Sequence, residues 1–198
     1  MSKRMNLGGI VMTVSRHDIN RERTIRSIEE AFLKEYSSKG IEGVSITSLC
    51  KNSGVSRSTF YLYFDDKYAV LENVEKRLLD GFWEANKDMP FVTDPDQKND
   101  HPKQVIKFLR SNEEWYKAIL GPHGDPGFTY RWKKVIIRTL DARLADKNIN
   151  KINTEIQGAI FSSGLIGLFT HILFEKPEVS DDVIGRYMTR LLGFSLKL

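Results

Sequence analysis

The chain alternates between amphipathic segments and short polar breaks, and the spacing of its apolar residues predicts helices throughout. Apolar side chains recur at intervals of three or four in 21–39, Lys67 to Asn86, 105–120 with a bend near Asn112, 128–145, 151–174 and a last segment capped by Ser180. No segment shows the sustained apolar and polar alternation of a strand. The pattern therefore predicts an all-α protein.

Residues 45–64 hold two short helical patterns joined by Gly54, which is the spacing of a helix-turn-helix, the unit that places one helix in the DNA major groove. Ser45 and Ser56 precede the two patterns as N-cap residues, and Gly54 stands where a left-handed cap is least costly. Phe60 and Phe64 are four residues apart, so both are predicted to face the core.

The outward face of the second short helix supplies the candidate DNA contacts. Arg57 is the main one, because arginine bound to guanine is the commonest specific contact; phosphate contact and simple solvation are its alternatives. Leu62 either touches a thymine methyl group or is a surface leucine. The residues predicted to read bases are Thr47, Arg57, Ser58, Tyr61 and Leu62. Those predicted to bind phosphate, with capping as the alternative for the serines and packing for Tyr63, are Ser45, Ser56, Thr59, Tyr63 and Lys67.

Charge and composition add to this interpretation. The 198 residues are 40% hydrophobic and 28% charged, with a net charge of +4. Residues 1–67 hold 11 Lys and Arg against 8 Asp and Glu, whereas the rest hold 19 against 18, so most of the positive excess accompanies the helix-turn-helix. Cys50 is the only cysteine, which excludes an intrachain disulfide and a cysteine-rich zinc site and fits a reducing cytoplasm. We predict a small core side chain at Cys50 rather than a redox switch.

No histidine spacing typical of a metal site, glycine-rich phosphate loop or catalytic side-chain set is present, so we expect no metal, no cofactor and no enzymatic activity. Residues 1–20 are predicted to form a flexible basic arm. In one alternative the natural start of the chain is Met12, and in another the arm touches the minor groove of DNA. The 19 residues from Ile156 to Phe174 carry no formal charge, a length that approaches a membrane span. Their polar residues and glycines favour a buried helix of a soluble protein.

The run Gly-Val-Ser-Arg-x-Thr-Phe-Tyr-x-Tyr-Phe at 54–64, followed by Lys67-x-x-x-Leu71, resembles the fingerprint of the TetR (AcrR-like) family of bacterial transcriptional regulators. The resemblance runs from about Arg21 to Leu71, and 111–120 and 160–168 look like one branch of the family's variable regulatory domains. Leu62 departs from the aromatic or histidine residue that often faces DNA in the family.

The resemblance implies a DNA-binding domain at 21–66 and a ligand-binding and dimerisation domain at 67–198. It also implies a homodimeric repressor that leaves a palindromic operator when a small molecule binds. Small residues spaced by four on 151–174, and the apolar side of the last helix, are predicted to meet the partner: Ala159, Ser163, Gly167, Tyr187 and Leu191. The residues predicted to line a ligand pocket, with plain core packing as their alternative, are Trp83, Phe108, Trp115, Tyr116, Trp132, Phe161 and His171. The competing functions are a DNA-binding regulator controlled by a protein partner, a helical interaction protein without DNA binding, and a membrane-anchored version.

Overall fold

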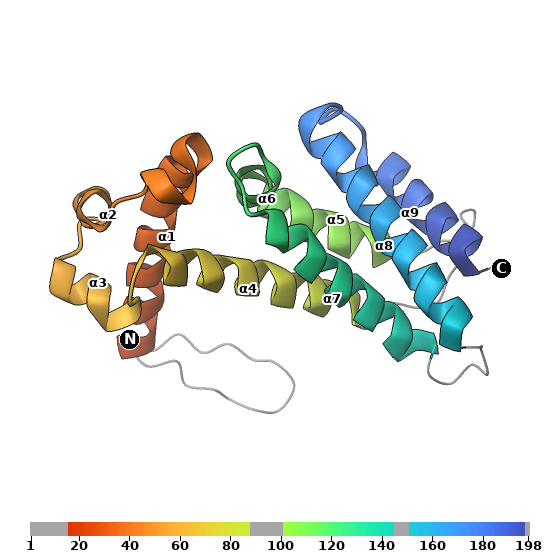
Figure 1. Ribbon diagram of the computed structural model, residues 1–198, viewed down its shortest axis with the longest axis horizontal. Coiled ribbons are helices and arrows are strands. Elements are labelled where there is room, and N and C mark those ends of the chain that lie inside the picture. The colour runs from red at the N-terminus through yellow and green to blue at the C-terminus, as the bar shows by residue number, and fades with distance from the viewer. Residues whose placement is uncertain (1–15, 88–100, 145–150, 197–198) are drawn as a thin grey trace. The chain divides into compact units, whose positions relative to one another are not determined.

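The computed structural model describes residues 16–87, 101–144 and 151–196, and within these ranges it contains nine α-helices and no strand (Figure 1). The helices are α1 (Arg16–Gly43), α2 (Ile46–Ser53), α3 (Arg57–Tyr63), α4 (Lys67–Asn86), α5 (His101–Ser111), α6 (Glu113–Leu120), α7 (Pro126–Leu144), α8 (Lys151–Phe174) and α9 (Asp181–Leu196). They divide into two compact units, one ending at Val74 and the other beginning at Glu75. The all-α prediction is confirmed.

The first unit, the head, is built on α1 and closed by α2, α3 and the first turns of α4. Its core side chains are completely or almost completely buried: Ile28, Phe32, Tyr36, Leu49, Phe60, Val70 and Val74. Phe32 and Tyr36 stack with ring centroids 5.2 Å apart. Gly40 has φ 65° and ψ −179°, so it interrupts α1 at the glycine where the sequence predicts the helix to end.

Two predicted boundaries differ from the structure. Helix α1 begins at Arg16, so the last five residues of the expected 1–20 arm are helical; Asp18 in the first turn favours this start through the helix dipole. Residues 1–15 lie outside the described part of the chain. The head extends to Val74 rather than to residue 66, because Val70 and Val74 complete its core and Asn73 Nδ2 donates to Glu29 Oε1 at 2.8 Å.

The second unit contains the rest of α4 and helices α5 to α9. In it α8 packs against both α7 and α9, and α5 packs against α9. Trp132 of α7 lies at its centre, with ring centroids 5.5 Å from Phe82, 5.0 Å from Tyr116 and 5.9 Å from Phe169. Asn112 separates α5 from α6, as the predicted bend requires.

Helix α8 has the length and composition of a membrane-spanning helix over Glu155–Phe174, with a mean hydropathy of 1.5. However, 44% of that segment is buried inside the second unit, where Leu165, Ile166 and Phe169 belong to the core. Figure 1 shows α8 running between α7 and α9. Its apolar composition is therefore that of a packed helix rather than of a membrane span.

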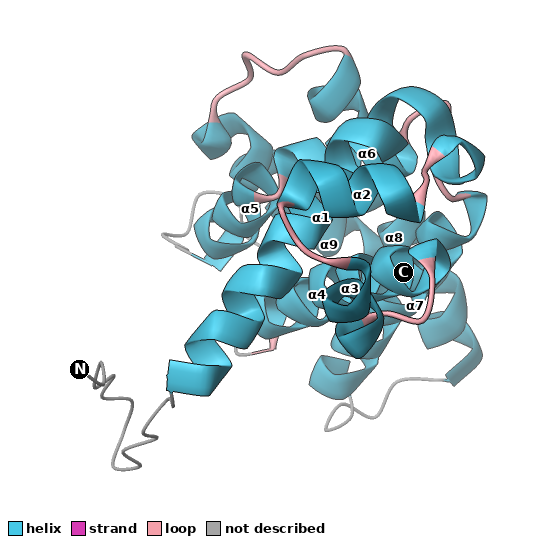
Figure 2. Ribbon diagram, turned by 90° about the vertical axis from the view of Figure 1, so that its left-hand side faces the viewer, coloured by secondary structure: helices cyan, strands magenta, loops and turns pink. Residues whose placement is uncertain are grey.

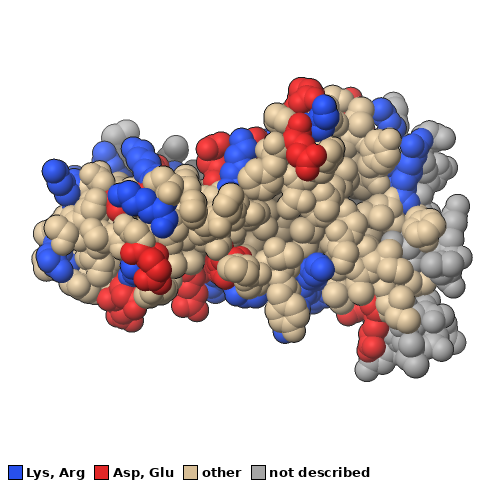
Figure 3. Space-filling view, turned by 45° about the horizontal axis from the view of Figure 1, so that its top comes forward, with Lys and Arg blue, Asp and Glu red and all other residues tan. Residues whose placement is uncertain are grey.

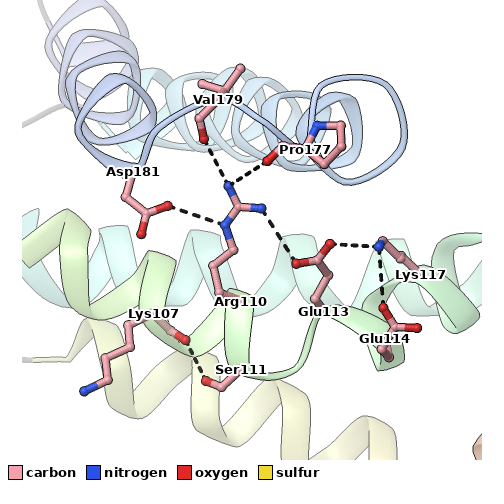
Figure 4. A network of polar contacts seen from close by, with 9 residues as sticks. All are labelled: Lys107, Arg110, Ser111, Glu113, Glu114, Lys117, Pro177, Val179 and Asp181. Atoms are coloured by element: carbon pink, nitrogen blue, oxygen red, sulfur yellow. Dashed lines mark hydrogen bonds and ion pairs between the residues drawn. The ribbon is translucent and has the colours of Figure 1, made fainter.

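Arg110, at the end of α5, fastens the connection between α8 and α9 (Figure 4). Its guanidinium donates to the carbonyl oxygens of Val179 at 3.1 Å and Pro177 at 3.4 Å, and to Asp181 Oδ1 at 3.4 Å. It also lies 3.7 Å from Glu113 Oε2 at the start of α6. One side chain thus joins α5, α6 and the entry to α9.

Candidate nucleic-acid interface

The helix-turn-helix of the head is fixed by its own local hydrogen bonds. Ser45 Oγ accepts from the backbone N–H of Ser48 at 3.2 Å, and Ser56 Oγ accepts from that of Thr59 at 3.0 Å. Gly54 has φ 70° and ψ 21°, and its N–H donates to the carbonyl of Cys50. Both predicted N-caps and the glycine turn are confirmed, and Cys50 is a buried free thiol. The loop that sets the angle between α2 and α3 is therefore fully specified by local sequence.

Helix α3 presents one buried and one exposed face. Phe60 and Phe64 are buried in the head, with their ring centroids 5.9 Å apart. On the other face Tyr61 is 49% and Leu62 73% exposed, large fractions for apolar side chains. Arg57 and Ser58 are exposed as well, and Figure 2 views the head from the side on which α3 lies. This face, together with the exposed Thr47 of α2, forms what we call the reading face: Thr47, Arg57, Ser58, Tyr61 and Leu62.

Several predicted phosphate ligands already have structural partners. Ser56 Oγ lies 2.8 Å from both Ser58 Oγ and Thr59 Oγ1, so these three hydroxyls form one cluster at the start of α3. Tyr63 is half-buried. Capping and binding of a phosphate oxygen are compatible for a hydroxyl, because it both donates and accepts.

Lys67 and Tyr68, at the start of α4, both contact Glu42 of α1. Lys67 Nζ donates to the carbonyl of Glu42 at 3.2 Å and lies 3.7 Å from its carboxylate. Tyr68 Oη donates to Glu42 Oε1 at 3.0 Å, and this hydrogen bond to a carboxylate raises the pKa of Tyr68 above its ordinary value. Lys67 is thus held in place, and an ammonium group retains donors for an anion.

Of the seven residues predicted to line a pocket, only Tyr116 and Trp132 are seen in ring contact with each other in the described part of the second unit. Trp132 and Tyr116 are core residues, whereas Trp83 stacks under Arg138 at 4.5 Å and Trp115 under Arg77 at 5.8 Å. Phe108 packs against Gly81, and His171 is exposed beside Glu175 Oε2 at 3.1 Å. Phe161 alone of the seven lines a small recess of the second unit that also includes Phe82 and Met188.

Among the described residues of the second unit, two small recesses each offer free space for about one water molecule. The first lies among α4, α7, α8 and α9 and includes Phe82, Asn86, Thr139, Phe161 and Met188. The second lies among α5, α8 and α9 under Arg110, and its lining is otherwise apolar. Within the described residues, no three His, Cys, Asp or Glu side chains are grouped as metal ligands.

The predicted dimer residues lie mostly on one exposed face of α8 and α9. Ala159, Ser163 and Gly167 are exposed, and a Cβ at Gly167 would meet no atom within 4 Å. Tyr187 is exposed, whereas Leu191 is half-buried and fills the space beside Gly164 of the same chain. The face also carries large exposed apolar side chains that the sequence pattern did not single out: Ile156, Ile160, Phe174 and Phe194.

One charged cluster was missed by the sequence patterns altogether. Arg131 of α7 bonds both Glu75 of α4 and Asp125 of the loop before α7. Burial, with the nearby Asp125 carboxylate, raises the pKa of Glu75 to about 7. Burial also acts on Asp125, but hydrogen bonds from Arg131 and the Gly127 N–H hold the pKa of Asp125 below its ordinary value. Residues 56 positions apart leave no periodic signal, so only the structure reveals the cluster.

Comparison with known proteins shows what the head is similar to. Residues 28–74 match a family model described as bacterial regulatory proteins, tetR family. Two uncharacterized HTH-type transcriptional regulators of Bacillus subtilis (strain 168) are also similar. YxbF is 21% identical over 171 residues, which are 84% of this chain and 44% of that protein. YvdT is 36% identical over 52 residues, which are 26% of this chain and 27% of that protein. The chain thus spans less than half the length of these relatives.

Solved structures share the fold across most of the chain. A TetR transcriptional regulator from Streptococcus agalactiae 2603V has a TM-score of 0.63 at 17% identity, covering 89% of this chain and 97% of that one. The dihydroxyacetone kinase operon activator DhaS has a TM-score of 0.61 at 16% identity, covering 88% and 96%. The flavonoid-responsive regulator FrrA has a TM-score of 0.54 at 17% identity, covering 89% and 96%.

Proposed function

We propose that this chain, a DNA-binding transcriptional regulator of the tetR family and not an enzyme, acts in the cytoplasm as a homodimer that represses transcription from a palindromic operator. A small molecule bound in the second unit would release it from DNA. The observation that carries the proposal is the reading face, because exposed Tyr61 and Leu62 on a helix held by two serine caps and Gly54 have no structural use in an isolated head.

Arg57 is assigned the main base contact, with Thr47, Ser58, Tyr61 and Leu62 as further readers. Its place on the first turn of α3 allows a long side chain to reach a base edge from the helix N-terminus. Ser45, Ser56, Thr59, Tyr63 and Lys67 are assigned to phosphate, which fixes the register of the head on the duplex.

A gel-shift titration against the DNA upstream of the chain's own gene tests the assignment. Arg57→Ala should weaken operator binding by about 1–3 kcal/mol, roughly 5- to 150-fold, and relax the preference at one base pair. Lys34→Ala removes an equally exposed charge from α1 and serves as the control, with an effect below about twofold. If the two substitutions have equal effects on operator binding, Arg57 does not contact the bases. A transcript that falls rather than rises when the gene is deleted would make the protein an activator, as the name of DhaS states for that protein.

The homodimer is supported by the exposed apolar face of α8 and α9. Ile156, Ile160, Phe174 and Tyr187 surround the small residues, which allow a second helix to approach closely. A symmetric partner would present the same face, so the surface is complementary to itself. Analytical ultracentrifugation should find a dimer that Ile160→Glu dissociates. Tyr130→Glu, which alters an exposed aromatic residue of α7, should leave the mass unchanged.

The effector site is assigned to the second unit, where two buried polar atoms, Tyr116 Oη and Trp132 Nε1, have no hydrogen-bond partner. Such atoms usually meet a partner, and a ligand can provide one. The recesses are small, so binding requires the helices to move apart. The alternative is control by a protein partner. To distinguish the two, the ultrafiltrate and the macromolecular fraction of a native cell extract are each added to the protein–operator complex. If the effector is small, only the ultrafiltrate should release DNA.

A further inference from the structure

The first three turns of α1 form a cationic surface that the helix-turn-helix does not account for. Residues 16–26 contain four arginines, Arg16, Arg21, Arg23 and Arg26, against two acidic residues. Residues 45–63, which include the whole helix-turn-helix, contain only Lys51 and Arg57 as cations. The first three turns of α1 therefore hold twice as many cationic side chains as the helix-turn-helix, and each of the two stretches has a net charge of +2.

Among the described residues, these arginines have no carboxylate partner, unlike several cations of the second unit. No ion pair joins any of the four to a carboxylate in the part of the chain that the structure describes, whereas Arg110, Lys117 and Arg131 are all paired. Two acidic residues of α1 turn inward instead. Glu29 Oε1 accepts from Asn73, and Glu35 Oε1 accepts from Asn52 at 3.1 Å, and both carboxylates are buried.

The segment also extends past the core of the head. Residues 16–23 are exposed without exception, and the first buried residue of α1 is Ile28. Figure 2 shows these turns projecting beyond the other helices of the head, and Figure 3 shows blue lysine and arginine side chains on the visible face of the head, with red acidic side chains beside them. At about 100° per residue, Arg16, Arg23 and Arg26 fall within about 80° of one another around the helix axis. They span about 15 Å, the length of four to five base pairs.

We propose that Arg16, Arg23 and Arg26 bind the DNA sugar–phosphate backbone beside the stretch read by α3. The proposal rests on the DNA binding described above. A helical segment without a buried face gains nothing from packing, so a run of unpaired arginines on it is suited to a polyanion. Duplex DNA is the polyanion that the head is proposed to bind through its reading face. Contacts of this kind add affinity and lengthen the footprint without changing which bases are preferred.

Salt titration of operator binding tests the proposal on the full chain. Arg23→Ala/Arg26→Ala should lower the slope of log K against log[NaCl] by about 2, since each phosphate contact contributes about 0.9. Alanine maintains the helix, and circular dichroism checks that it does. The matched control, Lys34→Ala/Lys39→Ala, removes two exposed charges from later turns of α1 and should leave the slope unchanged. Arg23→Lys/Arg26→Lys should restore the slope.

The outcomes separate this proposal from the assignment of the reading face. If Arg57→Ala relaxes base preference while Arg23→Ala/Arg26→Ala leaves slope and footprint as in the wild type, the arginines of α1 do not bind DNA and the reading face stands. Equal slopes for the arginine and lysine variants overturn the proposal. The proposal is also overturned if the arginine variant no longer binds phosphatidylglycerol vesicles but has the wild-type salt slope on DNA, because the arginines would then bind lipid instead of DNA. If Arg57→Ala has no effect, the assignment of the reading face fails independently.

Discussion

Glu75 provides the sharpest test of the second unit, because one guanidinium serves two carboxylates there. Arg131 bonds Oε2 of Glu75 and Oδ2 of Asp125, whereas Glu75 Oε1 is buried without a hydrogen-bond partner. The Glu75 side chain is only 8% exposed, and the cluster carries one negative charge when both acids are ionised. The deeper acid bears the cost of desolvation, which is why the pKa of Glu75 rises from 4.5 to about 7.

The consequence is a stability that falls as the pH rises. Between pH 4.5 and about 7 the folded chain retains a proton on Glu75 that the unfolded chain has released, so the free energy of unfolding decreases through this window. A shift of this size corresponds to at most about 3 kcal/mol, all of it lost above the folded pKa. Glu75→Gln removes the titrating group while an amide oxygen still accepts from Arg131. We therefore expect the variant to lose less stability than the wild type between pH 5 and pH 8, by up to about 3 kcal/mol.

Urea unfolding followed by tryptophan fluorescence measures this directly, because Trp83, Trp115 and Trp132 are the chain's three tryptophans and all belong to the second unit. Glu114→Gln is the control: this carboxylate is 76% exposed and 3.5 Å from Lys117, so its removal should leave the pH dependence as it is. The three proteins differ only at the substituted carboxylate, so a difference between their pH profiles comes from that group. Identical pH dependence of wild type and Glu75→Gln would refute the reasoning.

Three further substitutions have defined outcomes. Gly54→Ala places a side chain at φ 70° with no atom nearby to clash, so backbone strain alone should cost about 1 kcal/mol, measured by thermal melting in far-UV circular dichroism. Gly81→Ala brings a methyl group onto the ring of Phe108 and should cost about 1–3 kcal/mol in urea unfolding of the second unit. Lys67→Ala should weaken binding to all DNA sequences alike and lower the salt slope by about 0.9, as fluorescence anisotropy at several NaCl concentrations will show.

The helix-turn-helix could be predicted from sequence because its determinants are local. Gly54 needs a positive φ, Ser45 and Ser56 accept from N–H groups three residues ahead, and Phe60 with Phe64 marks the buried side of α3. Each signal lies within a few residues of the structure it determines. The head ends at Val74 rather than at the predicted residue 66 because of how α4 packs against α1, which periodicity does not encode. The first turns of α1 are exposed, so no apolar spacing marks the start of this helix at Arg16.

The interior of the second unit shows the other limit of sequence patterns. The predicted ligand pocket included Trp83, Trp115 and Trp132 alike, yet only Trp132 reaches the centre, while the other two lie under Arg138 and Arg77. The rotation of each helix about its axis is set by tertiary packing, so no single-helix pattern can assign residues to a common pocket. The Glu75 cluster has the same origin.

Helix α8 shows why composition alone left a membrane span and a buried helix as alternatives. A helix is apolar on all sides when each of its two sides packs against other apolar groups, and lipid is only one kind of group that can cover the second side. In α8 one side packs into the unit through Leu165 and Phe169, and the other carries Ile156 and Ile160 next to small residues. Lipid requires no small residues on its side, whereas close approach of a second helix does. The exposed stripe at Ser163 therefore favours a protein partner, and in the proposed homodimer a twofold copy of α8 would supply one with matching shape.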